Sequence, residues 1–257
     1  MMNHPLLPKL RALRLSGMLD TLEIRAAEAA TTQLTPSEFL AILLDDELER
    51  RRQSKLTRLT IEAGVDPAKT LAHFDFTAAP QVNRALVMEL ATCHFIPAAE
   101  NILMGGPTGT GKSHLANALT CEALKRGHTA YVRSAHRLLA ELQAARANGT
   151  FPRRFSRLCS LALLVIDDLG LRPLSPQGAE DLYELIRERY ERKPIIITSN
   201  RAFHEWPAAF GDDLLASAAL DRLTHHCHTL AVTGDSYRQR GRATSVEGGR
   251  HAPTPVA

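Results

Sequence analysis

One segment of eight residues constrains the fold of this chain more than any other feature: Gly-Pro-Thr-Gly-Thr-Gly-Lys-Ser at residues 106–113. It fits the pattern G-x-x-x-x-G-K-S/T without a mismatch. Its glycines let the backbone curl until several N–H groups point at one phosphate-sized hollow, and a following helix adds the positive end of its dipole. An apolar strand before the segment and a helix after it distinguish a true phosphate cradle from a Gly-rich turn that matches by chance, and the sequence predicts both.

The segment predicts a site for ATP and Mg²⁺. Lys112 supplies a positive charge for the β- and γ-phosphates, which also makes it a candidate catalytic residue, and the Ser113 hydroxyl is a ligand for the metal ion. The residues expected to bind the nucleotide are Gly106, Pro107, Thr108, Gly109, Thr110, Gly111, Lys112, Ser113 and His114.

An acidic pair is the second part of the predicted site. The apolar run 161–166 ends in Asp167 and Asp168. A strand that ends there places Asp167 at the carboxyl edge of the sheet, beside the cradle, where it can hold Mg²⁺ through water. Asp168 is then placed to orient or activate the attacking water. Taken alone, such a pair is more often a simple loop start, but its position one strand after the cradle favours the site.

Two further candidates stay open at this stage. Asn200 follows the apolar strand 195–199 and is able to hydrogen-bond the γ-phosphate or the attacking water, although Asn is also a common turn residue. Arg222 belongs to a predicted helix before the last strand. It can reach the ATP of a neighbouring subunit as an arginine finger, or it can pair with Asp221 or with solvent.

A histidine-rich stretch suggests a metal site only weakly. Residues 225–228 read His-His-Cys-His. Adjacent side chains do not converge easily on one ion, the stretch leads into a strand, and no second ligand cluster is evident nearby. We therefore expect no metal at these residues.

The apolar pattern divides the chain of 257 residues into three parts. Residues 1–75 read as a small helical domain, with helices separated at Ser16-Gly17 and a capping box at residues 35–38 that opens a long helix ending near Gly64. Residues 76–240 alternate strands with helices, which predicts an α/β domain with a parallel sheet. Residues 241–257 are expected to be disordered. The predicted strands are 101–104, 129–133, 161–166, 195–199 and 229–232.

Charge and composition limit the function classes. The net charge is only +3, but basic residues cluster at 50–58 and again at 125–157, where Glu141 is the single acidic residue. A solvated helix face explains some of these charges, while the second cluster favours contact with a DNA backbone. The basic residues of the second cluster are Lys125, Arg126, Arg133, Arg137, Arg146, Arg153, Arg154 and Arg157.

The cellular location follows from what the sequence lacks. We find no signal peptide, no membrane-length apolar run and no paired cysteine motif. A cytoplasmic protein with reduced thiols and no membrane partner is expected.

Several short motifs resemble one known family. They are the cradle, the stretch Leu-Leu-Val-Ile-Asp-Asp-Leu-Gly that ends at Gly170, and the segments 198–200, 220–223 and 234–238. Together they look like the IstB-like ATP-binding proteins, which are AAA+ helpers of insertion-sequence transposition related to the helicase loader DnaC. The likeness runs from about residue 5 to about residue 240.

The resemblance implies a P-loop AAA+ ATPase with a five-stranded parallel sheet after a small helical domain. Such a helper would assemble on double-stranded target DNA as an ATP-dependent homo-oligomer and recruit its cognate transposase, which stimulates hydrolysis. Asn200 would sense the γ-phosphate and Arg222 would be the intersubunit finger. Many AAA+ proteins carry Glu where Asp168 stands here, and Arg238 is the single, weak candidate for a second sensor arginine.

Three other functions compete with this interpretation. A DnaC-like loader would act on a replicative helicase. A P-loop kinase would need an Arg-rich acceptor pocket, which the later strands do not supply. A protein that uses ATP only to hold subunits together would not need Asp168 beside Asp167.

Overall fold

The computed structural model describes residues 5–233. Its contacts divide the chain between Leu59 and Thr60 into two compact units. The predicted tail at residues 241–257 and the sensor candidate Arg238 lie outside the described residues. The functional division at residues 75 and 76 stays a prediction.

The first unit packs short helices around a small core. Helix α1 (Leu6–Ala12) and helix α2 (Ser16–Thr32) are separate, as predicted, but the break lies at residues 13–15, and Ser16 and Gly17 belong to the first turn of α2. Both helices precede α3 (Pro36–Ala63). Leu10, Met18, Leu22 and Leu43 form the core. Gly17 permits a close approach of α2 to α3. Its amide donates to Glu47 Oε2 at 2.6 Å, and a Cβ atom on Gly17 would lie 2.7 Å from Glu47 Cα.

Helix α3 begins and ends as its sequence predicts. The Thr35 amide donates to Glu38 Oε2 at 2.8 Å, and the Glu38 amide donates to Thr35 Oγ1 at 3.3 Å. These reciprocal bonds satisfy donors that an α-helix leaves open at its N-terminus. The helix ends at Ala63, and Gly64 follows in the left-handed conformation with φ of 72°.

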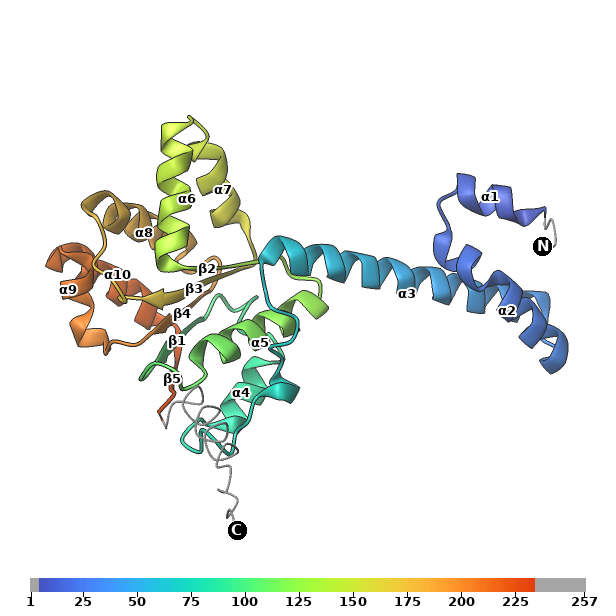
Figure 1. Cartoon of the computed structure of the whole chain (residues 1–257), viewed down its shortest axis with the longest axis horizontal. Helices are drawn as coiled ribbons and strands as arrows, with labels where there is room; N and C mark the ends of the chain where they lie inside the picture. The colour runs from blue at the N-terminus through green and yellow to red at the C-terminus, as the bar shows by residue number, and fades with distance from the viewer. Residues whose placement is uncertain (1–4, 234–257) are drawn as a thin grey trace, which may run out of the picture. The chain divides into compact units, whose positions relative to one another are not determined.

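A five-stranded sheet forms the centre of the second unit (Figure 1). The strand order is β2-β3-β4-β1-β5, and every neighbouring pair is parallel. Its runs of buried Leu, Ile and Val suit strands that are covered on both faces. The fold class predicted from the sequence is confirmed. The strands are β1 (Asn101–Gly105), β2 (Ala130–Ser134), β3 (Leu163–Leu169), β4 (Ile195–Ser199) and β5 (Cys227–Ala231).

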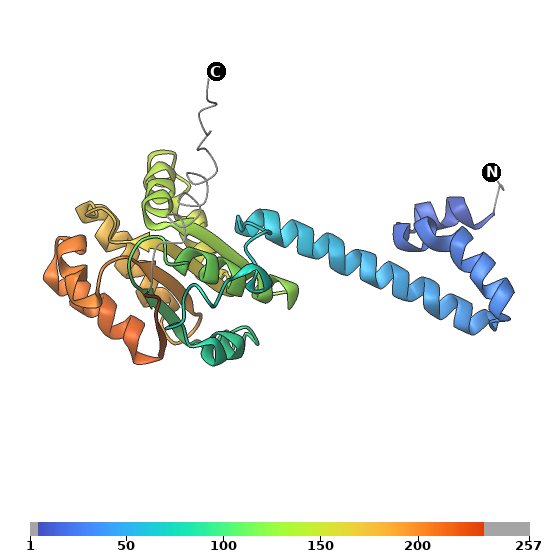
Figure 2. The same ribbon diagram turned by 60° about the horizontal axis from the view of Figure 1, so that its bottom comes forward.

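Helices cover both faces of this sheet (Figures 1 and 2). Helix α5 (Lys112–Lys125) packs on β2, β3 and β4. The opposite face presents Leu164, Ile166, Ile195 and Ile197 to a separate apolar cluster built with the later helices. Those helices are α6 (Ala135–Ala147), α7 (Phe151–Ser160), α8 (Pro176–Arg189), α9 (Trp206–Phe210) and α10 (Asp213–His225).

The segment before β1 contains two short elements. They are the 3₁₀ turn η1 (Leu71–His73) and helix α4 (Arg84–Leu90); a second turn, η2 (Phe203–Glu205), precedes α9. Among residues 5–233, no helix combines the length and the apolar character that crossing a lipid bilayer requires.

Candidate nucleotide-binding site

The cradle lies between β1 and α5, in the strand–loop–helix context that its sequence predicts. Gly106 and Gly111 adopt φ values of 145° and 100°, which L side chains rarely tolerate. A Cβ atom on Gly106 would lie 2.1 Å from the Val232 carbonyl oxygen, and one on Gly111 would lie 2.7 Å from the Phe74 ring. Both positions therefore need glycine for conformation and for space.

Lys112 is held inside the cradle loop. Its side chain is buried, and Nζ donates to the carbonyl oxygens of Gly106 and Pro107 at 2.6 Å each. Burial lowers the pKa of the Lys112 ammonium, and the charges of Asp168 and Asp167 partly oppose this shift. These two carboxylates help to keep the charge that a phosphate would meet.

Asp167 accepts hydrogen bonds from two hydroxyls on neighbouring elements. Ser113 Oγ donates to Asp167 Oδ1 at 2.8 Å, and Thr198 Oγ1 donates to the same oxygen. The Asp168 amide in turn donates to Thr198 Oγ1 at 3.0 Å. Helix α5 and strands β3 and β4 therefore meet at the carboxyl edge of the sheet, where ligands bind in open α/β folds. These oxygen atoms suit a hard cation such as Mg²⁺.

A bulge in β3 sets the direction of Asp168. The β3–β4 register shifts between Ile166 and Leu169, and Asp168 has a φ of 56°. Asp167 turns toward the two hydroxyls, while Asp168 is exposed and lines the cavity in front of the cradle. Bulges often re-aim side chains beside functional sites. The sequence predicts both carboxylates at this edge, but not the bulge that separates their directions.

The cavity in front of the cradle has a volume of about 540 Å³, which lies in the usual range for small-molecule sites. One wall comes from the segment before α4. His114 Nε2 contacts the Thr70 carbonyl at 2.8 Å, and Asn117 Nδ2 donates to the carbonyls of Asp66 and Lys69 at 2.8 and 3.0 Å. The wall residues are Lys69, His73, Phe74, Asp75, Ala78 and Ala79, and the other wall consists of residues 108–114 with Asp168 and Leu171.

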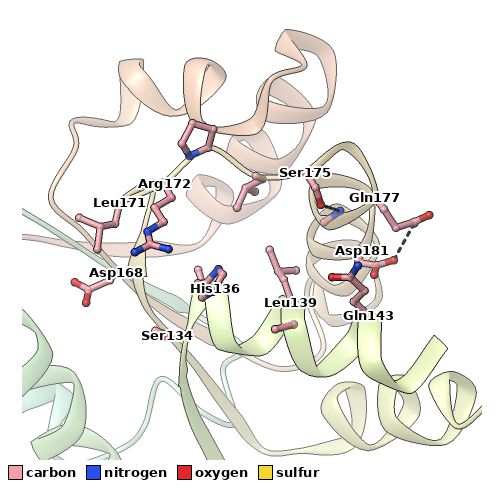
Figure 3. A pocket seen from close by; sticks show the side chains of 16 residues that line it. Ser134, His136, Leu139, Gln143, Asp168, Leu171, Arg172, Ser175, Gln177 and Asp181 are labelled. Carbon is pink, nitrogen blue, oxygen red and sulfur yellow. Dashed lines mark hydrogen bonds between the residues drawn. The ribbon is translucent and has the colours of Figure 1, made fainter. Parts of the chain in front are cut away.

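A second cavity of about 670 Å³ adjoins the first (Figure 3). It lies between α6 and the segment that joins β3 to α8. Asp168 lies at one end of it and Asp181 at the other. Asp168 and Leu171 line both cavities, so a group bound in the second cavity can approach the carboxylate that also faces the cradle.

Arg222 lies far from the cradle of its own chain. Its Nη1 donates to the Ala218 carbonyl at 2.8 Å, and the guanidinium lies 5.3 Å from the centre of the Tyr183 ring. The next residue, Leu223, accepts a bond of 3.1 Å from Asn101 Nδ2. Asn101 begins β1 and the cradle follows the end of β1, roughly 13 Å along the strand at its normal rise. Arg222 is therefore near the opposite edge of the sheet.

Asn200 is exposed immediately after β4. It does not line the nucleotide cavity, in contrast to Asp168. Thr198, two residues earlier in the same segment, is fully buried and contacts Asp167. Successive side chains of a strand point to opposite faces, so Thr198 and Ser199 face opposite sides of the sheet. This alternation is visible in the sequence, and it could have identified Thr198 as a candidate site residue.

Several arginines of the predicted DNA-binding cluster bind acidic residues within the fold. Glu141 accepts from Arg133 Nε at 3.1 Å and also from Arg154, which contacts the Tyr131 hydroxyl as well. Arg146 pairs with the buried Asp181. These arginines stabilise the packing around α6 and α7 and are poorly placed to follow a phosphate backbone.

Three arginines of the cluster remain exposed without an ion pair to any residue between 5 and 233. Arg137 belongs to α6, and Arg153 and Arg157 lie one turn apart on α7. The two helices pack against each other. This part of the surface keeps the positive charge that the sequence suggests. Lys125 and Arg126, also in the cluster, pair with Glu122.

Comparison with known proteins decides the family. The sequence matches the family described as IstB-like ATP binding protein over residues 8–245. The chain belongs to this family. An insertion-sequence ATP-binding protein of Mycobacterium tuberculosis is 38% identical over 240 residues, which cover 92% of this chain and 96% of the relative. The corresponding protein of Pseudomonas aeruginosa is 37% identical over 235 residues, covering 91% and 89%.

Solved structures place this IstB-like chain among AAA+ folds. DnaA from Aquifex aeolicus, bound to AMPPCP, has a TM-score of 0.57 at 23% identity and covers 72% of this chain and 56% of its own. The DnaC helicase loader has a TM-score of 0.50 at 22% identity, covering 58% and 89%. At these identities the likeness shows the fold alone. The predicted family and its AAA+ P-loop architecture are confirmed.

Proposed function

We propose that this IstB-like protein is an ATP-hydrolysing transposition helper that assembles on double-stranded DNA and recruits its cognate transposase. The arrangement around Asp167 carries the proposal, because Ser113 and Thr198 bring two hydroxyls to one carboxylate beside the cradle. A protein that used ATP only as a structural ligand would not need a second carboxylate, Asp168, facing the same cavity.

Each site residue has a distinct role in this proposal. The loop amides and Lys112 hold the phosphates, and Ser113 and Asp167 hold Mg²⁺. The ion, when bound, neutralises charge on the β- and γ-phosphates. Asp168 accepts a hydrogen bond from the attacking water and orients it. Asn200 contacts the γ-phosphate after a side-chain rotation, which its exposed position permits.

The position of Arg222 supports an oligomeric enzyme. It lies near the edge of the sheet opposite its own cradle, so it can serve a transition state only in another subunit. An arginine supplied from a neighbour stabilises the charge on the transferred phosphoryl group. We therefore propose an ATP-dependent homo-oligomer in which each site is completed by the next chain.

The exposed arginines of α6 and α7 support DNA binding. Arg137, Arg153 and Arg157 offer charge that is not used within the described fold. The transposase partner rests on the relatives, which are named as insertion-sequence ATP-binding proteins and match over nearly their whole length. The same relatives favour transposition over helicase loading, and the proposed location is the cytoplasm.

A phosphate-release assay tests the enzymatic part of this proposal. We expect the full chain to release phosphate from ATP with Mg²⁺ and no added acceptor, and DNA to increase the rate. Lys112→Ala removes the charge that meets the phosphates, so ATP binding should weaken and ATP-dependent assembly should be lost. Unchanged ATP affinity in Lys112→Ala would contradict the assigned site. ADP formation that requires a small-molecule acceptor and releases no free phosphate would indicate a kinase.

A further inference from the structure

The histidine-rich stretch gains a partner in the folded chain. The sequence suggests no second ligand cluster near residues 225–228, but the fold brings one further carboxylate to them. Glu191, directly after α8 and its cap Tyr190, lies beside His225 and His226 at the end of α10. The loop after one helix and the end of another, more than thirty residues apart in the chain, therefore bring a carboxylate to two imidazoles.

The donor atoms of these residues are close to the spacing of a metal site. His225 Nδ1 lies 3.5 Å from Glu191 Oε1, and His226 Nε2 lies 3.7 Å from the same oxygen. One ligand atom from each residue lies within 4.8 Å of the others. Ligands about 2.1 Å from a tetrahedral zinc ion are about 3.4 Å apart. All three side chains are exposed, so small rotations can close the remaining difference.

We propose that Glu191, His225 and His226 form a binding site for a divalent transition metal, with Zn²⁺ as the best match. Two imidazoles and one carboxylate form a ligand set that zinc uses in proteins, with a fourth position left for water. Magnesium and calcium prefer sites made of oxygen alone, so the two imidazoles select against them.

Neighbouring groups define the site before an ion binds. The Tyr190 hydroxyl hydrogen-bonds His225 Nδ1 at 2.7 Å, and a metal ion on Nδ1 takes the place of this bond. Glu191 has a φ of 56°, a left-handed conformation in which its side chain is near both rings. A bound ion would join the loop after α8 to the end of α10, within one helical turn of Arg222.

Zinc titration of the chelator-stripped full chain, against a chromophoric competitor, tests the site directly. Millimolar Mg²⁺ in the buffer occupies oxygen sites such as Ser113 and Asp167. We expect one zinc ion per chain with a dissociation constant in the micromolar range or below. Glu191→Gln and His226→Ala should each weaken binding at least tenfold. Their circular dichroism should match that of the parent.

Matched variants separate this site from other zinc ligands. His94→Ala removes an exposed histidine elsewhere and should leave zinc affinity unchanged. Cys227→Ser, next to the site, should change it little. Three outcomes would overturn the proposal: no stoichiometric zinc in the parent, unchanged affinity in Glu191→Gln and His226→Ala, or a loss in Cys227→Ser without a loss in Glu191→Gln.

Discussion

Thr198 donates its hydroxyl hydrogen to Asp167 and accepts the backbone amide hydrogen of Asp168. One buried side chain on β4 thus contacts the carboxylate of Asp167 and the backbone of Asp168 across the bulge in β3. Thr198 is a positioning residue, because it contacts Asp167 and does not line the cavity in front of the cradle. Its loss should affect the alignment of the site more than its occupancy.

Thr198→Val keeps the shape of the side chain and removes the hydroxyl. We expect kcat for ATP hydrolysis to fall by about 10- to 100-fold, as is typical when a partner of a metal-binding carboxylate is removed. The KM for ATP should change little, and Thr198→Ser should restore kcat. A Thr198→Val enzyme with the parent kcat, or a Thr198→Ser enzyme as slow as Thr198→Val, would contradict this role.

Arg153 and Arg157 are the arginines of α7 that remain available for DNA. The double change to Gln should weaken binding to all sequences alike. It should reduce the slope of log affinity against log salt by about 2, because each phosphate contact contributes roughly 1. The control is the double variant Arg187→Gln/Arg192→Gln. It removes the same amount of positive charge from α8 and from the turn after it. Equal slopes for the parent and the α7 variant would exclude these contacts.

Glu141 links the stability of the second unit to pH. Burial tends to raise the pKa of its carboxyl, but hydrogen bonds from Tyr131, Arg154 and Arg133 outweigh burial and lower the pKa below 4.5. A carboxyl whose pKa is lowered in the folded state stabilises the protein above its unfolded pKa, and this contribution disappears as pH falls through the folded value.

Unfolding by denaturant at several pH values checks this linkage. Glu141→Gln should destabilise the chain near neutral pH, and its free energy of unfolding should fall less steeply than that of the parent below pH 4.5. Glu89→Gln, an exposed change, should follow the parent curve. Parallel curves for the parent and Glu141→Gln would show that the Glu141 contacts do not contribute.

The sequence predicts the parts of this fold that local patterns determine. The cradle motif, the capping box at Thr35 and the strand 195–199 are set by short-range chemistry, and the structure has each of them at the predicted residues. No helix is predicted from the sequence over residues 151–160, where the structure has α7 with Pro152 in its first turn. The Gly149 turn and a proline in the first turn are normal features around a helix start.

Long-range contacts explain the rest. In the sequence, Arg154 is one more residue of a basic cluster. The fold brings Glu141 and Tyr131 to its side chain. The close approach of Phe74 to Gly111 is not predicted, because it depends on packing between segments far apart in the chain. Glu191 meets His225 for the same reason. Such pairings carry no signal in the spacing of residues.

Mixing two inactive variants tests the central claim, an ATP site completed by Arg222 of a neighbouring chain. Arg222→Ala keeps its own cradle and should bind ATP but hydrolyse it poorly, since a finger supplied in trans contributes about 10³ to 10⁵ in rate. Asp168→Asn should also bind ATP without hydrolysing it, because its water is not oriented.

In a mixed oligomer, one class of interface joins the intact acidic pair of an Arg222→Ala chain to the intact Arg222 of an Asp168→Asn chain. The ATP hydrolysis rate of the mixture, measured where co-assembly is verified, should therefore rise well above that of either variant alone. A mixture as inactive as its parents, with co-assembly demonstrated, would contradict a finger acting between subunits.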